Sequence, residues 1–214
     1  MIKILFLLSL GLFTQLLQAT GVHTVFPDIV KPHSSYVFYS HGAIVEGDNP
    51  RPVHPKFGTY EFPEIREALM NSDHELIAYH RPAGVSVQEH INRLVTDVRR
   101  LLDAGVKEQN ITLIGFSKGG AISIRAASLM KKNLNLVILA SCFNNLTKNP
   151  DTLLYGNILS IYETSDFVGS CQTIIDRSAG VKQFKEIALS TGKGHGTFYT
   201  PDPVWLTHVK SWLK

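Results

Sequence analysis

The sequence predicts a single α/β domain, in which helices cover both faces of a mostly parallel central sheet. Short, continuous apolar runs recur along the chain, and segments with helical periodicity separate them. No repeat, charge block or low-complexity linker interrupts this alternation. Continuous apolar strands that alternate with helices are typical of parallel sheets whose two faces are both covered.

The N-terminal residues have the pattern of a secretory signal peptide. Lys3 gives a cationic start, and the apolar run at 4–13 is too short to span a bilayer comfortably. Ala19 supplies a small residue at the predicted cleavage point. We therefore expect a signal peptide at 1–19 and one secreted or periplasmic domain at 20–214, without stable membrane insertion after cleavage. An uncleaved membrane anchor is the alternative.

Six apolar runs are the candidate strands of the sheet. They lie at residues 36–40, 76–80, 111–114, 136–140, 158–162 and 184–190. Most of them are continuous apolar runs, as expected for the strands of a parallel sheet covered on both faces.

The clearest helix spans residues 87–103, where apolar residues recur at helical spacing and form one stripe. Ser86 and Glu89 predict a capping box at its start, and Gly105 is a natural left-handed stop after its end. This helix precedes the strand at 111–114 and so provides the right-handed crossover into it.

Two further helices complete the predicted domain. A weaker one lies at 63–70, and a final one begins with Asp202 as N-cap and Pro203 in the first turn. Three prolines at positions 50, 52 and 55 predict a rigid surface loop. Only about 15 residues separate Cys142 from the next strand, so we expect no large lid.

Charge and motif content exclude several classes of protein. The chain carries 21 Lys and Arg against 18 Asp and Glu, a formal net charge of +3, and the excess is scattered. Nucleic-acid binding is therefore not indicated. The histidines lack ligand spacing such as H-x-x-x-H, and neither G-x-G-x-x-G nor a P-loop is present, so we expect no metal and no cofactor.

Cys142 and Cys171 are the two cysteines of the chain, and both belong to the part predicted to be exported. Each follows an apolar run, so both can lie at the same end of neighbouring parallel strands. A disulfide there would close a loop of about 30 residues and contribute about 3 kcal/mol. Two separate buried thiols are the alternative.

The run ITLIGFSKGG at 111–120 is the strongest functional signal in the chain. In this run a buried strand leads into a G-x-S-x-G turn, and a helix-compatible segment follows. Gly115 and Gly119 remove side chains that would collide where the strand and helix pack closely. This context predicts that Ser117 is a nucleophile and that the backbone N–H of Lys118 points at a developing oxyanion.

The chain resembles the α/β-hydrolase fold at this elbow and in the order of nucleophile, acid and histidine. His195 follows the last predicted strand in a glycine-rich loop, and the resemblance implies a general base there. It implies that Asp166, just past a strand, is the acid that orients His195. Glu163 is the second choice, and Asp176 is disfavoured because it falls on the next helix. The usual first two strands look short or missing between 22 and 34.

The segment Ser-His-Gly-Ala at 40–43 resembles the family's oxyanion loop. The resemblance implies that Ala43 N–H is the second oxyanion donor, while His41 braces the loop. Glu46 either binds a polar substrate group or ties the loop to a nearby cation, and the second role is favoured. The Lys118 ammonium either favours anionic substrates or is a surface lysine, and again the second is favoured.

Together these residues predict a serine hydrolase that cleaves small-molecule or carrier-linked carboxylic esters through an acyl-enzyme. An amidase, peptidase or thioesterase can use the same residues, because the fold and the triad do not select the bond. A non-catalytic binding protein with the hydrolase fold is a further alternative, which the occupied triad positions disfavour.

Overall fold

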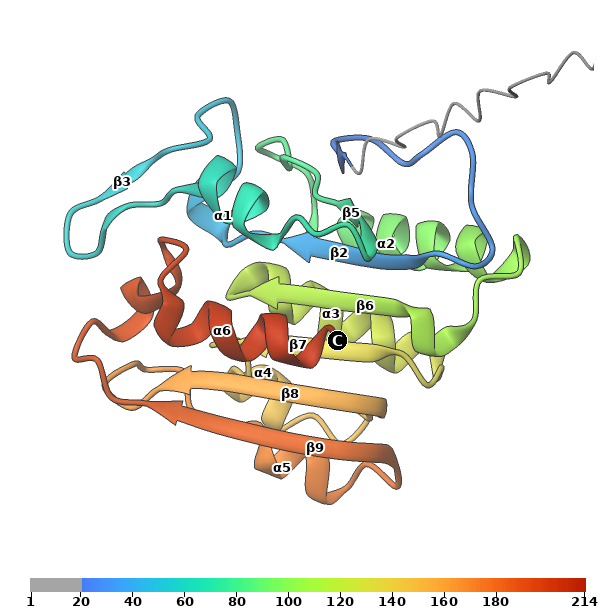
Figure 1. Ribbon diagram of the computed structural model, residues 1–214. Coiled ribbons are helices and arrows are strands. Elements are labelled where there is room, and N and C mark those ends of the chain that lie inside the picture. The colour runs from blue at the N-terminus through green and yellow to red at the C-terminus, as the bar shows by residue number, and fades with distance from the viewer. Residues whose placement is uncertain (1–20) are drawn as a thin grey trace, which may run out of the picture.

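The structure is a computed structural model that describes residues 21–214. The predicted signal peptide at 1–19 lies outside the described residues. Seven parallel strands form one sheet in the order β1-β5-β2-β6-β7-β8-β9 (Figure 1). They are β1 (Val22–His23), β2 (Ser35–Ser40), β5 (His74–Ile77), β6 (Ile111–Phe116), β7 (Asn135–Leu139), β8 (Tyr155–Glu163) and β9 (Gly180–Leu189). The predicted α/β class with a parallel sheet is confirmed.

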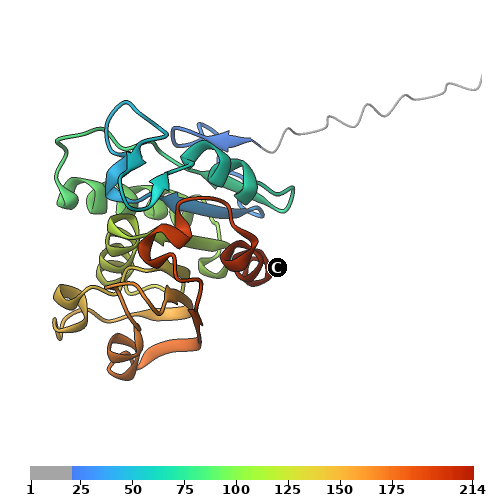
Figure 2. The same ribbon diagram turned by 90° about the vertical axis from the view of Figure 1, so that its left-hand side faces the viewer.

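Helices cover both faces of this sheet, as Figure 2 shows along its edge. One face carries α2, α3, α4 and α5, and the other carries α1 and α6. These helices are α1 (Phe62–Leu69), α2 (Val87–Asp103), α3 (Lys118–Met130), α4 (Asn144–Thr147), α5 (Gln172–Asp176) and α6 (Pro203–Trp212). Alternate residues of each strand therefore pack into two separate apolar cores, one on each face of the sheet.

Strand β2 illustrates this division of the core. Tyr36 and Phe38 pack into the core under α2 and α3, whereas Val37 and Tyr39 pack into the core under α1 and α6. Because successive strand residues point to opposite faces, a strand that is apolar throughout serves both cores at once.

The helix ends follow the signals in the sequence. Ser86 accepts from the backbone N–H of Glu89 at 3.2 Å, and the Glu89 carboxylate accepts from the N–H of Ser86 at 3.0 Å, which completes the capping box of α2. Gly105, with a φ of +90°, follows the end of this helix. Asp202 caps α6 by accepting from the N–H of Val204 at 2.9 Å.

β8 and β9 begin before the predicted runs, at Tyr155 and Gly180, and two further regions differ from the sequence prediction. β5 spans His74–Ile77 rather than 76–80, and the N–H of Ala78, which donates to the carbonyl of His23 at 2.9 Å, makes the last contact with β1. The proline-rich segment, predicted as a loop, contains a short antiparallel hairpin of β3 (Val53–His54) and β4 (Gly58–Thr59). As predicted, only a trimmed strand, β1, precedes β2 within the described residues.

The carboxyl ends of the strands form the edge on which function is expected. The loops after β2, β6, β8 and β9 carry Ala43, Ser117, Asp166 and His195 in that order. Within residues 21–214, the insertion between β7 and β8 holds only the short helix α4, so no large lid is inserted at that point. No helix in that range is both long and apolar enough to cross a membrane.

Candidate functional site

Ser117 occupies a strained corner between β6 and α3. Its φ of +53° and ψ of −122° lie in a region that residues with a side chain rarely adopt. The N–H of Ser117 donates to the carbonyl of Leu139 at 3.0 Å, which anchors the corner to β7. A side chain on Gly119 would collide with the carbonyls of Ser40 and His41, so glycine is required where these loops meet.

The structure brings together Ser117, His195 and Asp166 in one chain of hydrogen bonds. His195 Nε2 lies 2.8 Å from Ser117 Oγ, and His195 Nδ1 lies 2.6 Å from Asp166 Oδ2. An Asp carboxylate accepts only, so Nδ1–H donates to it and Nε2 is left to accept the hydroxyl proton of the serine. The side chains of His195 and Asp166 are 8% and 1% exposed. This is the arrangement needed to deprotonate a serine.

Glu163, the second choice for the acid, contacts backbone groups of two loops rather than His195. Its carboxylate accepts from the N–H groups of Ser165 at 2.7 Å, Thr191 at 2.9 Å and Gly192 at 3.1 Å, and from the hydroxyl of Ser165. Burial raises the pKa of Glu163, but these hydrogen bonds outweigh it and hold the pKa below its usual range. One carboxylate therefore joins the loop of Asp166 to the loop of His195. Asp176 lies in α5, as expected.

The two predicted oxyanion donors lie in loops that touch each other. Lys118 is the first residue of α3, and Ala43 begins a short 3-10 turn after Gly42. Within residues 21–214, neither of these two backbone N–H groups donates a hydrogen bond to the protein. Both donors are therefore free for a substrate oxygen.

Ion pairs join the same two loops on the protein side. Glu46 Oε2 lies 2.7 Å from Lys118 Nζ, and Glu46 Oε1 lies 3.2 Å from Arg81 Nε. Burial raises the pKa of Glu46, yet its bonds to Lys118 and Arg81 outweigh this and lower it overall. Glu46 thus ties the loop to a nearby cation, as the sequence favoured, and that cation is Lys118, a partly exposed lysine. The sequence analysis did not identify Arg81 as a residue of this site.

His41 braces the oxyanion loop. It is fully buried, its Nδ1 donates to the carbonyl of Gly42 at 2.7 Å, and its Nε2 accepts from the N–H of Arg81 at 2.9 Å. Burial, reinforced by the positive charge of Arg81, lowers the pKa of His41 to about 2. The imidazole is therefore neutral, and backbone groups occupy both of its ring nitrogens.

Aromatic rings surround His195. Ring centroids of Phe116 and Phe167 lie 4.8 Å and 5.1 Å from that of His195, and Phe57 lies at 6.3 Å. Phe167 is 77% exposed, an unusual exposure for such a ring. Its N–H donates to Asp166 Oδ1 at 2.7 Å, so the exposed ring directly follows the acid.

A disulfide lies next to this site. Cys142 and Cys171 are bonded, with their Cα atoms 5.2 Å apart. The bond links the loop after β7 to the loop after β8, which carries Asp166. The two cysteines thus occupy the same end of neighbouring strands.

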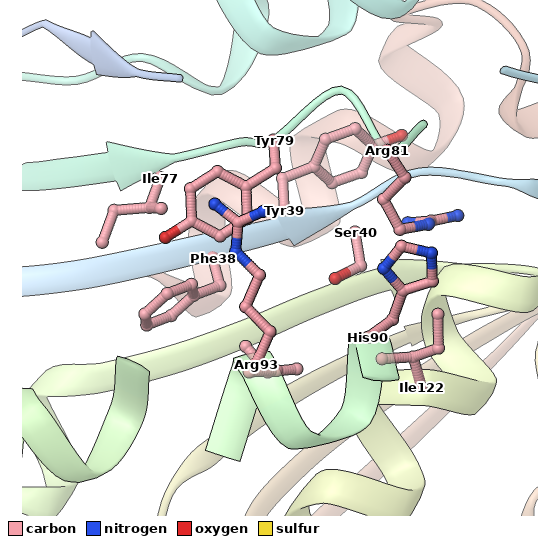
Figure 3. Close-up of a pocket in the computed structure, with 10 residues that line it drawn as sticks. Phe38, Tyr39, Ser40, Ile77, Tyr79, Arg81, His90, Arg93 and Ile122 are labelled. Atoms are coloured by element: carbon pink, nitrogen blue, oxygen red, sulfur yellow. The ribbon is translucent and has the colours of Figure 1, made fainter. Parts of the chain in front are cut away.

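A small cavity lies behind the oxyanion loop, between β2, β5 and α2 (Figure 3). Its volume is about 30 Å³, and His90 Nε2, which is buried, has no hydrogen-bond partner in the part of the chain that the structure describes. Such a volume holds about two water molecules, so the cavity is too small for an organic ligand. Within that same part of the chain, no group of three His, Cys, Asp or Glu side chains is placed to hold a metal ion.

Known proteins resemble this chain in sequence and in structure. The family model described as phospholipase/carboxylesterase matches residues 80–192, just over half of the chain. SOBER1 from Arabidopsis thaliana is similar in structure, with a TM-score of 0.56 and 14% identity over 84% of this chain and 97% of that chain. A search of curated proteins finds no match.

Two further structures share the fold. Est1E from Butyrivibrio proteoclasticus, solved with ferulic acid bound, has a TM-score of 0.57 and 12% identity over 86% of this chain and 89% of that chain. An esterase from Pyrococcus furiosus has a TM-score of 0.61 and 13% identity over 86% of this chain and 83% of that chain. These similarities confirm the α/β-hydrolase fold.

Proposed function

Because this chain belongs to the phospholipase/carboxylesterase family of α/β-hydrolases, we propose that it is a secreted or periplasmic serine hydrolase that cleaves carboxylic esters. The observation that carries the proposal is the hydrogen-bonded chain from Ser117 through His195 to Asp166. In this assignment Ser117 is the nucleophile, His195 the general base and Asp166 the residue that orients the imidazole.

The first half of the reaction forms an acyl-enzyme. Ser117 Oγ attacks the ester carbonyl carbon while its proton passes to His195 Nε2, and the carboxylate of Asp166 stabilises the resulting imidazolium. The carbonyl oxygen becomes an oxyanion, which accepts hydrogen bonds from the N–H groups of Lys118 and Ala43. When the tetrahedral intermediate collapses, the bond to the alcohol oxygen breaks and that oxygen takes the proton from Nε2.

The second half releases the acid. Water attacks the acyl carbon, His195 Nε2 takes its proton, and collapse of the second intermediate returns that proton to Ser117 Oγ. Both halves use the same two oxyanion donors. The Glu46 carboxylate bonds to the side chains of Lys118 and Arg81, so it supports the loops without occupying the N–H groups that face the substrate.

Export of the protein is part of the same proposal. The signal-peptide pattern at 1–19 motivates it, and the disulfide between Cys142 and Cys171 supports it, because such bonds persist in oxidising compartments. We expect the intact mass of exported protein to correspond to cleavage after Ala19. Recovery of the uncleaved chain from the membrane would instead support the anchor.

Active-site labelling tests the catalytic assignment. A fluorophosphonate probe should label the wild-type protein at Ser117, and p-nitrophenyl acetate should be turned over. Ser117→Ala should abolish both, because the probe and the substrate need the same nucleophile. Unchanged turnover in Ser117→Ala, together with an unlabelled but folded wild-type protein, would remove the enzyme assignment.

A further inference from the structure

We propose that the alcohol part of the ester substrate is a neutral carbohydrate, bound in a polar groove beside His195. The groove has a volume of about 520 Å³, and Phe143, Asn144, Asn145, Thr147, Phe167 and Thr173 are among the residues that line it. This inference rests on the proposed function, because it names the substrate of the same site. The volume lies in the range typical of small-molecule sites.

The position of the groove fits the leaving group. His195 Nε2 must protonate the departing alcohol, so the alcohol has to lie on the side of His195. The exposed ring of Phe167, 5.1 Å from the ring of His195, forms part of the groove wall. The loop after β7 supplies Phe143, and that loop begins where the carbonyl of Leu139 accepts from the N–H of Ser117. The groove is therefore separated from His195 only by the ring of Phe167, which contacts both.

The lining combines two flat apolar faces with neutral polar groups. The rings of Phe143 and Phe167 have centroids 6.2 Å apart and are tilted by 40°. Within residues 21–214, the side chains of Asn144, Asn145 and Thr173 make no hydrogen bond to the protein. The amide groups can both donate and accept, and so can the hydroxyl. These groups are available to the hydroxyls of a ligand, while the rings suit the C–H face of a sugar.

Other alcohol groups fit this lining poorly. A long alkyl chain would bury the amides and hydroxyl without partners, which is unfavourable. A phosphate would meet no cation, because none of the residues that line the groove carries a charge and Cys142 is held in the disulfide. A sugar supplies both hydroxyls and an apolar face, and so it matches the whole lining.

The test holds the acyl group constant and varies only the alcohol. Release of acetate by the exported protein is titrated for ethyl acetate, methyl 6-O-acetylglucopyranoside, octyl acetate and acetylated glycerol 3-phosphate. We expect kcat/KM for the acetyl glucoside to exceed that for each of the other three esters by about tenfold, since several hydrogen bonds form only with the sugar.

Substitutions then locate the sugar. Asn145→Ala should lower the ratio of kcat/KM for the acetyl glucoside to that for ethyl acetate by about fivefold, the effect of losing one hydrogen bond. Thr173→Val, which keeps the shape of the side chain, should lower it to a similar extent. Asn92→Ala is the matched control, because Asn92 is an exposed residue of α2 outside the groove, and it should leave the ratio unchanged.

The outcomes separate the two proposals. If p-nitrophenyl acetate and ethyl acetate are hydrolysed but the acetyl glucoside is not preferred, or octyl acetate or the phosphate ester is preferred, the carbohydrate proposal is overturned and the esterase remains. An unchanged ratio in both groove variants also overturns it. If no ester is hydrolysed and Ser117 is not labelled, the proposed function itself fails, and the groove proposal fails with it.

Discussion

The loops on the two sides of Ser117 are connected by different kinds of bond. On the acid side, a disulfide and the hydrogen bonds of the buried Glu163 hold the loops of Asp166 and His195. On the oxyanion side, Glu46 forms ion pairs with Lys118 and Arg81, and the Lys118 side chain is 27% exposed. Salt screens exposed charges but acts little on covalent bonds and on buried hydrogen bonds.

This difference indicates which conditions disturb each side. The acid side should respond to reductant, and the oxyanion side to salt and to loss of a charge. The base and acid need fixed mutual geometry throughout the reaction, whereas the oxyanion donors act through backbone groups that neighbouring loops hold. The expected effects below run from the largest to the smallest.

Asp166→Asn should cause the largest loss on the acid side. We expect kcat for p-nitrophenyl acetate to fall by about 10⁴-fold, because an amide no longer holds His195 in the tautomer that accepts the proton of Ser117. Glu163→Gln should cost far less, since Glu163 touches the loops and not the imidazole. Comparable losses in the two variants, or a larger one in Glu163→Gln, would reassign the acid.

Removal of the disulfide should weaken the acid side without changing its chemistry. The double variant Cys142→Ser, Cys171→Ser should lose about 3 kcal/mol of unfolding free energy, as expected for opening a loop of this length. Urea unfolding measures the loss. Dithiothreitol should destabilise the wild-type protein to the same extent and leave the double variant unaffected. Equal stability of the two proteins without reductant would contradict this account.

A lower pH should destabilise the folded protein on the oxyanion side, through the buried side chain of His41. Burial and Arg81 lower its pKa to about 2 in the folded protein, so below about pH 6.5 the unfolded chain binds a proton that the folded protein does not. Stability should therefore fall with falling pH, by about 1.4 kcal/mol per pH unit from this group. Burial also lowers the pKa of His74 and His90, which adds to the slope in the same direction.

His41→Gln isolates that contribution. Glutamine can donate to the carbonyl of Gly42 and accept from the N–H of Arg81, but it does not titrate. Between pH 6.5 and 5.5, the slope of unfolding free energy against pH should be shallower in the variant than in the wild-type protein, as urea titrations would show. An identical slope would mean that His41 is protonated in the folded protein.

Glu46→Gln should have the smallest effect of the four. It leaves Lys118 and Arg81 without their carboxylate, and we expect kcat/KM to fall by about tenfold through misplacement of the oxyanion loops. High salt should reduce kcat/KM of the wild-type protein in the same direction. Glu64→Gln, which removes a more exposed ion pair with Arg51, is the matched control and should change kcat/KM little.

The sequence predicted best what local signals specify. Helix α2 has the predicted bounds because its caps and its apolar stripe lie within a single segment. The sequence predicted that the first strands would be short or missing but did not place β1, since two residues give no periodicity and their partner β5 lies about 50 residues away. The end of β5 was placed too late, because the apolar run continues after the chain has left the sheet.

In the site, too, local signals could be predicted and long-range contacts could not. Ser117, Asp166 and His195 stand where strands end, so their positions followed from the motif and the chain order. The contacts of Lys118 did not, because Glu46 lies 72 positions away and only the folded sheet brings the two together. Arg81 carries no motif at all, and its contacts with His41 and Glu46 depend on the pairing of β2 with β5.

Glu163 has a consequence for how this enzyme can change. Because one carboxylate binds the backbone of the loops after β8 and β9, an insertion in either loop that displaces Ser165 or Thr191 also displaces His195. The loop after β7 and the hairpin at 53–59 have no such tie to this carboxylate. The disulfide joins the loop after β7 to the loop of Asp166 instead, so new substrate preferences are most accessible to evolution or design through the hairpin, while the pair of loops joined by Glu163 is inherited as one unit.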